Sequence, residues 1–185
     1  MKKIAIVICC FTILLTGAAV KAQSAYEIMA RHFAEDYYTG LLRIAESASR
    51  DEPELINHAK EIEIQLYKLI GNGEMGLPIF LEMRVPNDID KIFDSKTNPK
   101  ETIAIPNYFG RFSDYATQYK FCFNYELVSC KQLDTPSMQE YAGKRYHYVD
   151  VVVKKKYRWN RKTTRVKETM CVGFEGNSVF LINIK

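Results

Sequence analysis

The stretch that decides the fold is residues 144–184, with the sequence KRYHYVDVVVKKKYRWNRKTTRVKETMCVGFEGNSVFLINI. It is rich in β-branched and aromatic residues, which favour strands. Two interruptions, at Asn160-Arg161 and at Gly176-Asn177, contain the Asn and Gly that two-residue hairpin turns favour. The stretch therefore predicts three antiparallel strands joined by two tight turns.

The first turn sets a register that can be tested against polarity. Trp159 then lies opposite Lys162, and alternate residues of both strands share a face. One face carries mostly apolar residues, namely His147, Val149, Val151 and Lys155 opposite Phe174, Val172, Met170 and Val166. The other face carries the cations Lys154, Lys156, Arg158, Arg165 and Lys167. A shift by one residue would bury these cations at a large cost in free energy, so we expect the apolar face inward and the cations in water.

Two amphipathic helices are predicted before these strands. The first, over residues 24–48, has apolar residues at alternating three- and four-residue steps, at Tyr26, Met29, Phe33, Tyr37, Leu41 and Ile44. The second begins with a capping arrangement of Asp51, Pro53 and Glu54. It ends at residues 71–73, where Gly and Asn tolerate positive φ.

Shorter elements are predicted between the helices and the final strands. Residues 79–85 and 102–105 are expected to form short strands, and residues 87–93 a helical turn capped by Asn87 or Asp88. A longer strand is expected where large residues alternate with smaller ones, at Tyr119, Phe121, Phe123, Tyr125 and Leu127. The predicted fold is α+β, with two N-terminal helices packed on one face of a curved, mainly antiparallel sheet.

This order of elements resembles the nuclear transport factor 2-like superfamily, the cone-shaped fold of ketosteroid isomerases and many small exported bacterial proteins. The resemblance depends on element order and on the meander of residues 146–184, with no diagnostic motif. A cystatin-like fold and an unrelated helix-on-sheet sandwich are the alternatives. The resemblance implies a homodimer through the exposed sheet face, at the apolar row Phe180, Ile182 and Ile184. Packing of this row by the chain's own loops is the alternative.

The first 22 residues predict a cleavable secretory signal peptide. Lys2 and Lys3 precede an apolar run, and Ala22 ends a cleavage site with small residues. A retained membrane anchor is the alternative. We therefore expect an exported chain, in the periplasm or outside the cell, with a single domain over residues 23–185 and no membrane span after cleavage.

Removal of the signal peptide leaves the chain nearly neutral, because 23 basic residues then face 22 acidic ones. The charges are unevenly placed, since residues 144–167 hold ten Lys and Arg, opposed only by Asp150. Interleaved Tyr157 and Trp159 make this hairpin similar to a nucleic-acid-binding face, but an exported protein rarely meets nucleic acid. Periplasmic polyanions, phospholipid headgroups or an acidic partner protein are better candidates than nucleic acid. The simpler interpretation, which needs no binder, is a merely solvated sheet face.

No catalytic residue, metal or cofactor is predicted. The sequence has no G-x-S-x-G, no H-E-x-x-H and no phosphate-binding glycine loop. Two H-x-x-E pairs, His32 with Glu35 and His58 with Glu61, are expected to be solvated, because both glutamates point away from the apolar stripes.

Three aspartates, Asp88, Asp90 and Asp94, resemble the start of a calcium loop. The run lacks the glycine and the closing glutamate of that loop. A capped turn at the surface is therefore the prediction.

Three cysteines remain after cleavage, at Cys122, Cys130 and Cys171. On one strand, Cys122 and Cys130 would be about 26 Å apart, too far to bond. Both are expected on the sheet face that carries Cys171, so the disulfide to consider joins Cys171 to Cys122 or Cys130. Unpaired buried thiols are the alternative.

Together these patterns predict an exported, non-catalytic binding or interaction domain. Its helix-sheet concavity would be lined by Tyr157, Trp159, His147, Phe121, Phe123 and Tyr125 and would bind a small hydrophobic ligand, unless these rings only cap the core. One rival is a small periplasmic enzyme of the isomerase or hydratase class, which needs an inward carboxylate. Asp150 is expected to face outward, which leaves Asp114 as the candidate. The other rival is a structural component of an envelope assembly.

Overall fold

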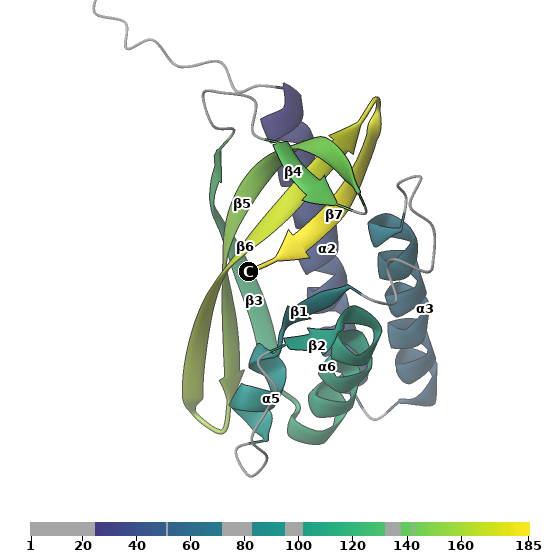
Figure 1. The fold of residues 1–185 in the computed structure, drawn as a ribbon. Coiled ribbons are helices and arrows are strands. Elements are labelled where there is room, and N and C mark those ends of the chain that lie inside the picture. Colours follow the sequence, from purple (N-terminus) through teal and green to yellow (C-terminus); the bar gives the residue numbers. More distant parts are fainter. Residues whose placement is uncertain (1–24, 51, 72–82, 95–101, 132–137, 142) are drawn as a thin grey trace, which may run out of the picture.

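The computed structural model describes residues 25–50, 52–71, 83–94, 102–131, 138–141 and 143–185, and its architecture is α+β as predicted (Figure 1). The elements follow one another as α2 (Ala25–Ala48), α3 (Pro53–Ile70), β1 (Arg84–Pro86), α5 (Asp88–Phe93), β2 (Thr102–Ala104), α6 (Ile105–Tyr119), β3 (Cys122–Lys131), β4 (Met138–Tyr141), β5 (Lys144–Trp159), β6 (Lys162–Glu175) and β7 (Ser178–Ile184). The predicted capping residue Asp51 and most of the predicted strand at residues 79–85 lie outside the described residues. Glu52 precedes α3, without a side-chain cap.

The main sheet is antiparallel, with strands in the order β3, β5, β6 and β7, and β4 pairs with the beginning of β5. Both predicted hairpins are confirmed, since Trp159 lies opposite Lys162 and Phe174 opposite Val179. Asn160 and Arg161 have φ of 44° and 62°, the left-handed conformation that a two-residue turn between twisted strands requires. The register of the long hairpin is therefore the one that polarity predicts.

Alternation along β5 separates an apolar face from a cationic one. Val149, Val151 and Val153 are buried toward the helices. Lys154 and Lys156, on the opposite face, are exposed. This arrangement is the one that the sequence predicts, and it positions every site described below.

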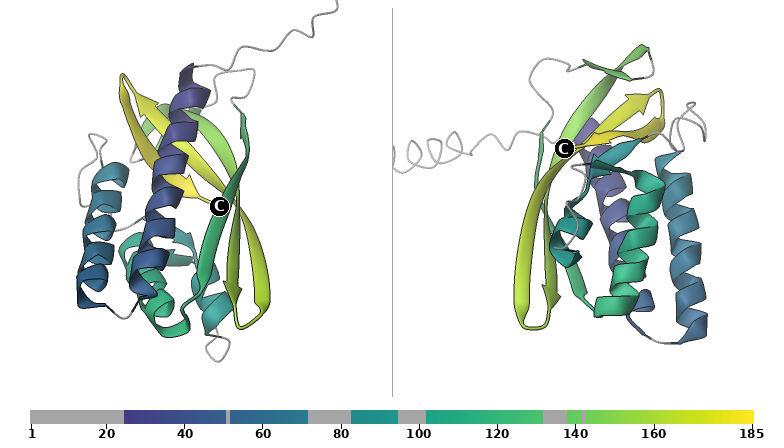
Figure 2. Two further views of the ribbon diagram at one scale, coloured as in Figure 1. Left: turned by 180° about the vertical axis from the view of Figure 1, so that it is seen from behind. Right: turned by 60° about the horizontal axis from the view of Figure 1, so that its bottom comes forward.

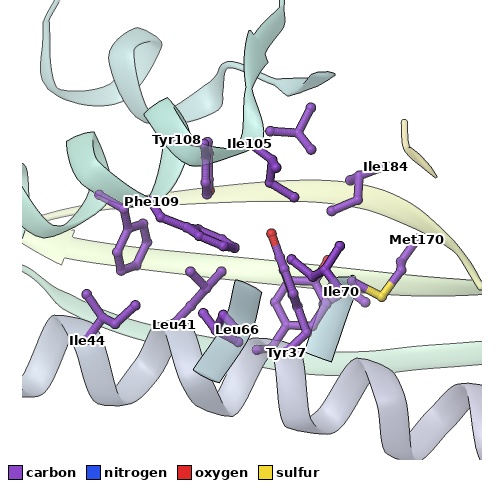
Figure 3. Close-up of a cluster of buried hydrophobic side chains, with 14 of the residues drawn as sticks. Tyr37, Leu41, Ile44, Leu66, Ile70, Ile105, Tyr108, Phe109, Met170 and Ile184 are labelled. Atoms are coloured by element: carbon purple, nitrogen blue, oxygen red, sulfur yellow. The ribbon is translucent and has the colours of Figure 1, made fainter. Parts of the chain in front are cut away.

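Helix α2 crosses the concave face of the sheet, α6 lies beside it, and α3 packs against the outer side of α2 (Figure 2). Gly40 permits the close approach of α3, because a Cβ at this position would lie 2.5 Å from Cδ2 of Leu66. Side chains of α2, α3 and α6 meet those of β6 and β7 in one core (Figure 3). The sheet's apolar face is thus covered by α2 and α6 directly, while α3 forms an additional layer.

Helix α6 is the described helix that sequence analysis missed, and strand β4 was not predicted either. Ile105, Tyr108, Phe109, Phe112 and Ala116 are buried at helical spacing, and a proline stands in the first turn. Tyr119, which was predicted to begin the following strand, instead ends α6. Aromatic residues favour strands by intrinsic propensity, and here packing against α2 and the sheet overrides that preference.

Two irregularities in the sheet reverse the direction of neighbouring side chains. The β3–β5 register shifts between Leu127 and Ser129, so residues beyond the shift change face. The β6–β7 register shifts between Cys171 and Val172, so Ile184 joins the core on the helix side. The prediction that Ile184 shares a face with Phe180 and Ile182 is therefore wrong.

Candidate functional site: a buried lysine network and a cationic sheet face

The predicted binding concavity is filled by aromatic side chains. Phe121, Phe123 and Tyr157 are buried, with 4% exposure or less. Phe93 of α5 stacks on Phe121 with ring centroids 4.7 Å apart, and Phe112 of α6 lies edge-on to Phe123 at 5.3 Å. Among the described residues, these rings pack against one another.

The other residues predicted for the concavity lie at its margins. Trp159 is half-buried against Phe93, with centroids 4.8 Å apart. The hydroxyl of Tyr125 lies 2.8 Å from Oγ1 of Thr39, at the sheet edge. His147 is exposed ten residues away from Tyr157 along β5, so it does not join the aromatic cluster.

A charged network lies in the core beside these rings. Lys155, on the helix side of β5, places its Nζ 2.8 Å from Oδ2 of Asp88 and 2.7 Å from Oε2 of Glu168. The side chains of the three residues are 2%, 8% and 5% exposed. The lysine network, as we call these three residues, therefore joins α5, β5 and β6 inside the fold.

Tyrosine hydroxyls surround the lysine network. Tyr157 donates a hydrogen bond to Oδ2 of Asp88 at 3.0 Å, and Tyr38 donates to Oε1 of Glu168 at 2.5 Å. Lys155 donates to the hydroxyl oxygen of Tyr108 at 3.3 Å. These donors help to offset the excess of two carboxyls over one ammonium, because buried charges need hydrogen-bond partners.

The enclosure changes the proton affinity of each group. Burial and the nearby Asp88 raise the pKa of Glu168, although Lys155 and Tyr38 oppose the shift. Burial disfavours the charged form of Lys155, but attraction to Asp88 and Glu168 raises its pKa well above the ordinary value. Burial, followed by the charge of nearby carboxylates and tyrosines, raises the pKa of Tyr157 and Tyr38. A carboxyl that holds a proton more tightly thus lies next to a lysine and a second carboxyl.

The aspartates of α5 are buried, which corrects the prediction of a surface turn. Asn87 caps α5 by accepting a hydrogen bond from the backbone N–H of Asp90, as predicted. The carboxylate of Asp90 pairs with Arg111 and accepts a hydrogen bond from Tyr115 at 3.0 Å. These contacts hold α5 against α6 and direct Asp88 toward β5. The described residues contain no group of three metal-ligating side chains.

Several predicted residues take no part in this network. His32 and Glu35 form an exposed pair 3.4 Å apart on α2. Asp114, the carboxylate considered for an enzyme, is exposed on α6. Among the described residues, the buried carboxylates that contact Lys155 are instead those of Asp88 and Glu168. Strand parity already placed Lys155 inward, and the same parity applied to β6 would have found Glu168, which lies opposite the inward Val153.

None of the three described cysteines is in a disulfide. Cys122 pairs with Arg158 near the hairpin tip, whereas Cys171 pairs with Asp150, about 26 Å along the same strand. Cys130 donates to the carbonyl oxygen of Glu27 on α2, because the shift in β3 turns it to the helix side. The expectation that all three cysteines share a face of the sheet is therefore wrong. Burial, together with the nearby Asp150, raises the pKa of the Cys171 thiol to about 12.

The row proposed as a dimer contact is covered within the chain. Phe180 and Ile182 are each 3% exposed and pack with Tyr146 on the outer face. Gly173 makes this packing close, because a Cβ there would lie 2.7 Å from Cδ1 of Ile182. The chain's own side chains thus cover these two residues.

The cationic face is the principal charged surface of the hairpin. It consists of the exposed residues Lys154, Lys156, Arg158, Arg165 and Lys167 on β5 and β6. Lys154 lies directly opposite Lys167, and Lys156 opposite Arg165. A groove of about 360 Å³ crosses this face and is lined in part by Asn124 and Glu126 of β3. In the part of the chain that the structure describes, none of the five cations forms a salt bridge.

Comparisons with protein-family models, with curated proteins and with solved structures find no match for this chain. No helix in the described ranges has both the length and the apolar composition needed to cross a membrane. Function must therefore be inferred from the chemistry of the lysine network and the cationic face. The network has acid, base and amine groups and is buried, while the face is exposed and carries mostly positive charge.

Proposed function

We propose that the chain is an exported, non-catalytic binding domain, and that its cationic face binds an extended acidic segment of a partner protein. The observation that carries this proposal is the alignment of five exposed cations, four of which form two directly opposed pairs of like charge. Opposed like charges destabilise a sheet. An anionic partner would relieve this repulsion, so the face is complementary to negative charge.

The free edge of β6 favours a polypeptide over other anions. β7 pairs with β6 only from Met170 to Glu175, and Thr169 exchanges backbone hydrogen bonds with Lys185. From Thr163 to Lys167, the described strands include no neighbour for β6 on this side, where the hairpin extends past the end of β7 (Figure 1). An extended segment can add a strand to such an edge through backbone hydrogen bonds.

Side-chain alternation defines the sequence of the expected partner. Residues at every second position of an added strand point to the same face. Acidic residues at alternate positions would then meet Arg165 and Lys167, which stand next to the free edge. Cations on an edge also prevent two copies of this chain from pairing with each other.

Export and the fold resemblance remain parts of the proposal. The described order of elements is two helices, a short strand pair with a six-residue helix between its strands, a further long helix and a long antiparallel meander. This order supports the resemblance to the nuclear transport factor 2-like superfamily. Expression with the full leader tests export, and a periplasmic product that begins at Gln23 is the expected result.

The binding test uses a synthetic peptide of alternating glutamate and threonine. Trp159 is the only tryptophan and lies at the hairpin tip, so its fluorescence reports binding. The double variant Arg165→Gln/Lys167→Gln should weaken binding by about tenfold or more, since each interfacial charge contributes on the order of 1 kcal/mol. The matched control Lys60→Gln/Lys68→Gln removes two exposed charges from α3 and should bind like the parent.

Three results would contradict the proposal. The parent chain could fail to bind the acidic peptide at low ionic strength. The α3 control could lose as much affinity as the β6 variant. Anionic phospholipid vesicles could bind the chain while the peptide does not, which would assign the face to a membrane surface.

A further inference from the structure

We propose that Lys155 and Asp88 form an intramolecular isopeptide cross-link, in which Nζ of Lys155 condenses with the side-chain carboxyl of Asp88 and Glu168 transfers the protons. This inference concerns the lysine network and is independent of the cationic face. It assigns a covalent modification to three residues that lie on α5, β5 and β6.

Proximity is the first argument. Nζ of Lys155 lies 2.8 Å from Oδ2 of Asp88, so the amine and the carboxyl are held in contact by the fold. Groups that are fixed in this way react with effective concentrations far above any concentration in solution. The side chains of both residues are more than nine-tenths buried, which keeps water from the bond once it forms.

The reaction needs no external reagent. Glu168 accepts a proton from Nζ, and the nitrogen lone pair then attacks Cγ of Asp88 to form the Nζ–Cγ bond. A second proton leaves the nitrogen as the tetrahedral intermediate collapses, and one Cγ–O bond breaks. The two protons leave with that oxygen as water, and Glu168 returns to its initial protonation state. An ammonium and a carboxylate become a neutral amide and one water molecule.

The surrounding groups suit these steps. Glu168 is 2.7 Å from Nζ, within reach of the proton that must leave it. Tyr157 donates to Oδ2 of Asp88 at 3.0 Å and can stabilise the negative charge that develops on this oxygen. Tyr38 donates a hydrogen bond to Oε1 of Glu168 and thereby fixes the orientation of this carboxyl.

The hydrogen bonds distinguish the reacting carboxyl from the proton carrier. Both oxygens of Glu168 are held, one by Tyr38 and one by Lys155. Oδ1 of Asp88 is buried and has no hydrogen-bond partner among the described residues, so departure of this oxygen breaks no contact there. Desolvation raises the pKa of Glu168, which favours uptake of a proton, whereas attraction to Asp88 and Glu168 raises the pKa of Lys155 and opposes its release. Asp88 is therefore the acyl partner.

Mass spectrometry of the folded, purified chain tests the cross-link. The intact mass should be lower than the sequence mass by one water molecule. Trypsin should yield a branched product that joins residues 85–91 to Lys155-Lys156, because an acylated Lys155 is no longer a cleavage site. The variants Lys155→Arg, Asp88→Ala and Glu168→Gln should all show the full, unreduced mass.

A further variant separates this chemistry from an effect on folding. Asp88→Asn should form the same branched product as the parent, with ammonia as the leaving group in place of water. Recovery of unlinked peptide 85–91 from the folded parent, at the full intact mass, would overturn the proposal. A branched product that contains Glu168 in place of Asp88 would overturn the assignment of the acyl partner.

Discussion

The three consecutive lysines of β5, Lys154, Lys155 and Lys156, lie in two different environments, the solvent and the core. Lys154 and Lys156 are exposed on the cationic face, whereas Lys155 is 2% exposed between two carboxyls. The three residues are chemically identical, and strand alternation alone separates them. The comparison shows that the role of a charged residue in a sheet depends first on which face its side chain points to, and only then on its residue type. The predictions below test the difference between the inner and the outer face.

The largest effect is expected at high pH. Tyr37, Tyr38, Tyr108 and Tyr157 are buried on the inner side, and burial raises the pKa of each above the ordinary value of 10.0. Above pH 10, the unfolded chain loses protons that the folded chain keeps, so the free energy of unfolding falls as pH rises. The slope approaches about 1.4 kcal/mol per pH unit for each tyrosine, or about 6 kcal/mol for the four at pH 11.

Absorbance of tyrosinate and far-ultraviolet circular dichroism measure this effect together. Part of the tyrosinate signal should appear only in the transition in which secondary structure is lost. Gradual ionisation of all twelve tyrosines in a chain that stays folded would contradict the enclosure of the inner side.

The next largest effect is expected from Lys155→Met. This change leaves Asp88 and Glu168 buried without their cation, which costs at least about 3–5 kcal/mol of the free energy of unfolding. The matched change Lys154→Met, one residue away on the cationic face, should cost less than about 0.5 kcal/mol. Urea denaturation at pH 7 measures both, and equal losses would remove the distinction between the two faces.

A smaller loss is expected from Tyr38→Phe. This change removes the donor to Oε1 of Glu168 inside the core, which should cost about 1.5–3 kcal/mol. Tyr125→Phe removes a hydroxyl from the sheet edge, where water can replace its contact with Thr39. We expect the control to change stability by less than about 0.5 kcal/mol, as thermal denaturation can show.

The smallest effect is expected on the cationic face and has the opposite sign. Arg165→Glu places a carboxylate opposite Lys156 and replaces a repulsive pair with an attractive one. The free energy of unfolding should rise by about 0.2–1 kcal/mol at low ionic strength. The gain should largely disappear in 1 M salt, where charges are screened within about 3 Å. A lower free energy of unfolding at low salt would show that repulsion between the opposed cations does not destabilise the folded chain.

Much of the fold could be predicted because its signals are local. Helix periodicity predicted α2 and α3, and turn residues with alternation predicted the register of β5, β6 and β7. Helix α6 was missed although Tyr108, Phe109 and Phe112 have helical spacing. Their aromatic character favours strands, and only packing against α2 determines that this segment forms a helix.

The candidate site was harder to predict because its parts are distant in sequence. Parity placed Lys155 on the inner face, and the capping pattern placed Asp88 at the start of a short helix. No local pattern shows that these two positions meet, because residues 88 and 155 are brought together by the packing of α5 against α6 and the sheet.

For the β5–β6 hairpin, the sequence by itself determined which side chains point inward and which face carries cations, because a shift in register would bury several charges at a prohibitive cost. The tertiary structure alone decided what Lys155 meets there. The partners of a buried charge depend on how separate elements pack, and the register shifts in β3 and β7 likewise depend on long-range contacts. Only the folded chain therefore brings an amine and two carboxyls together.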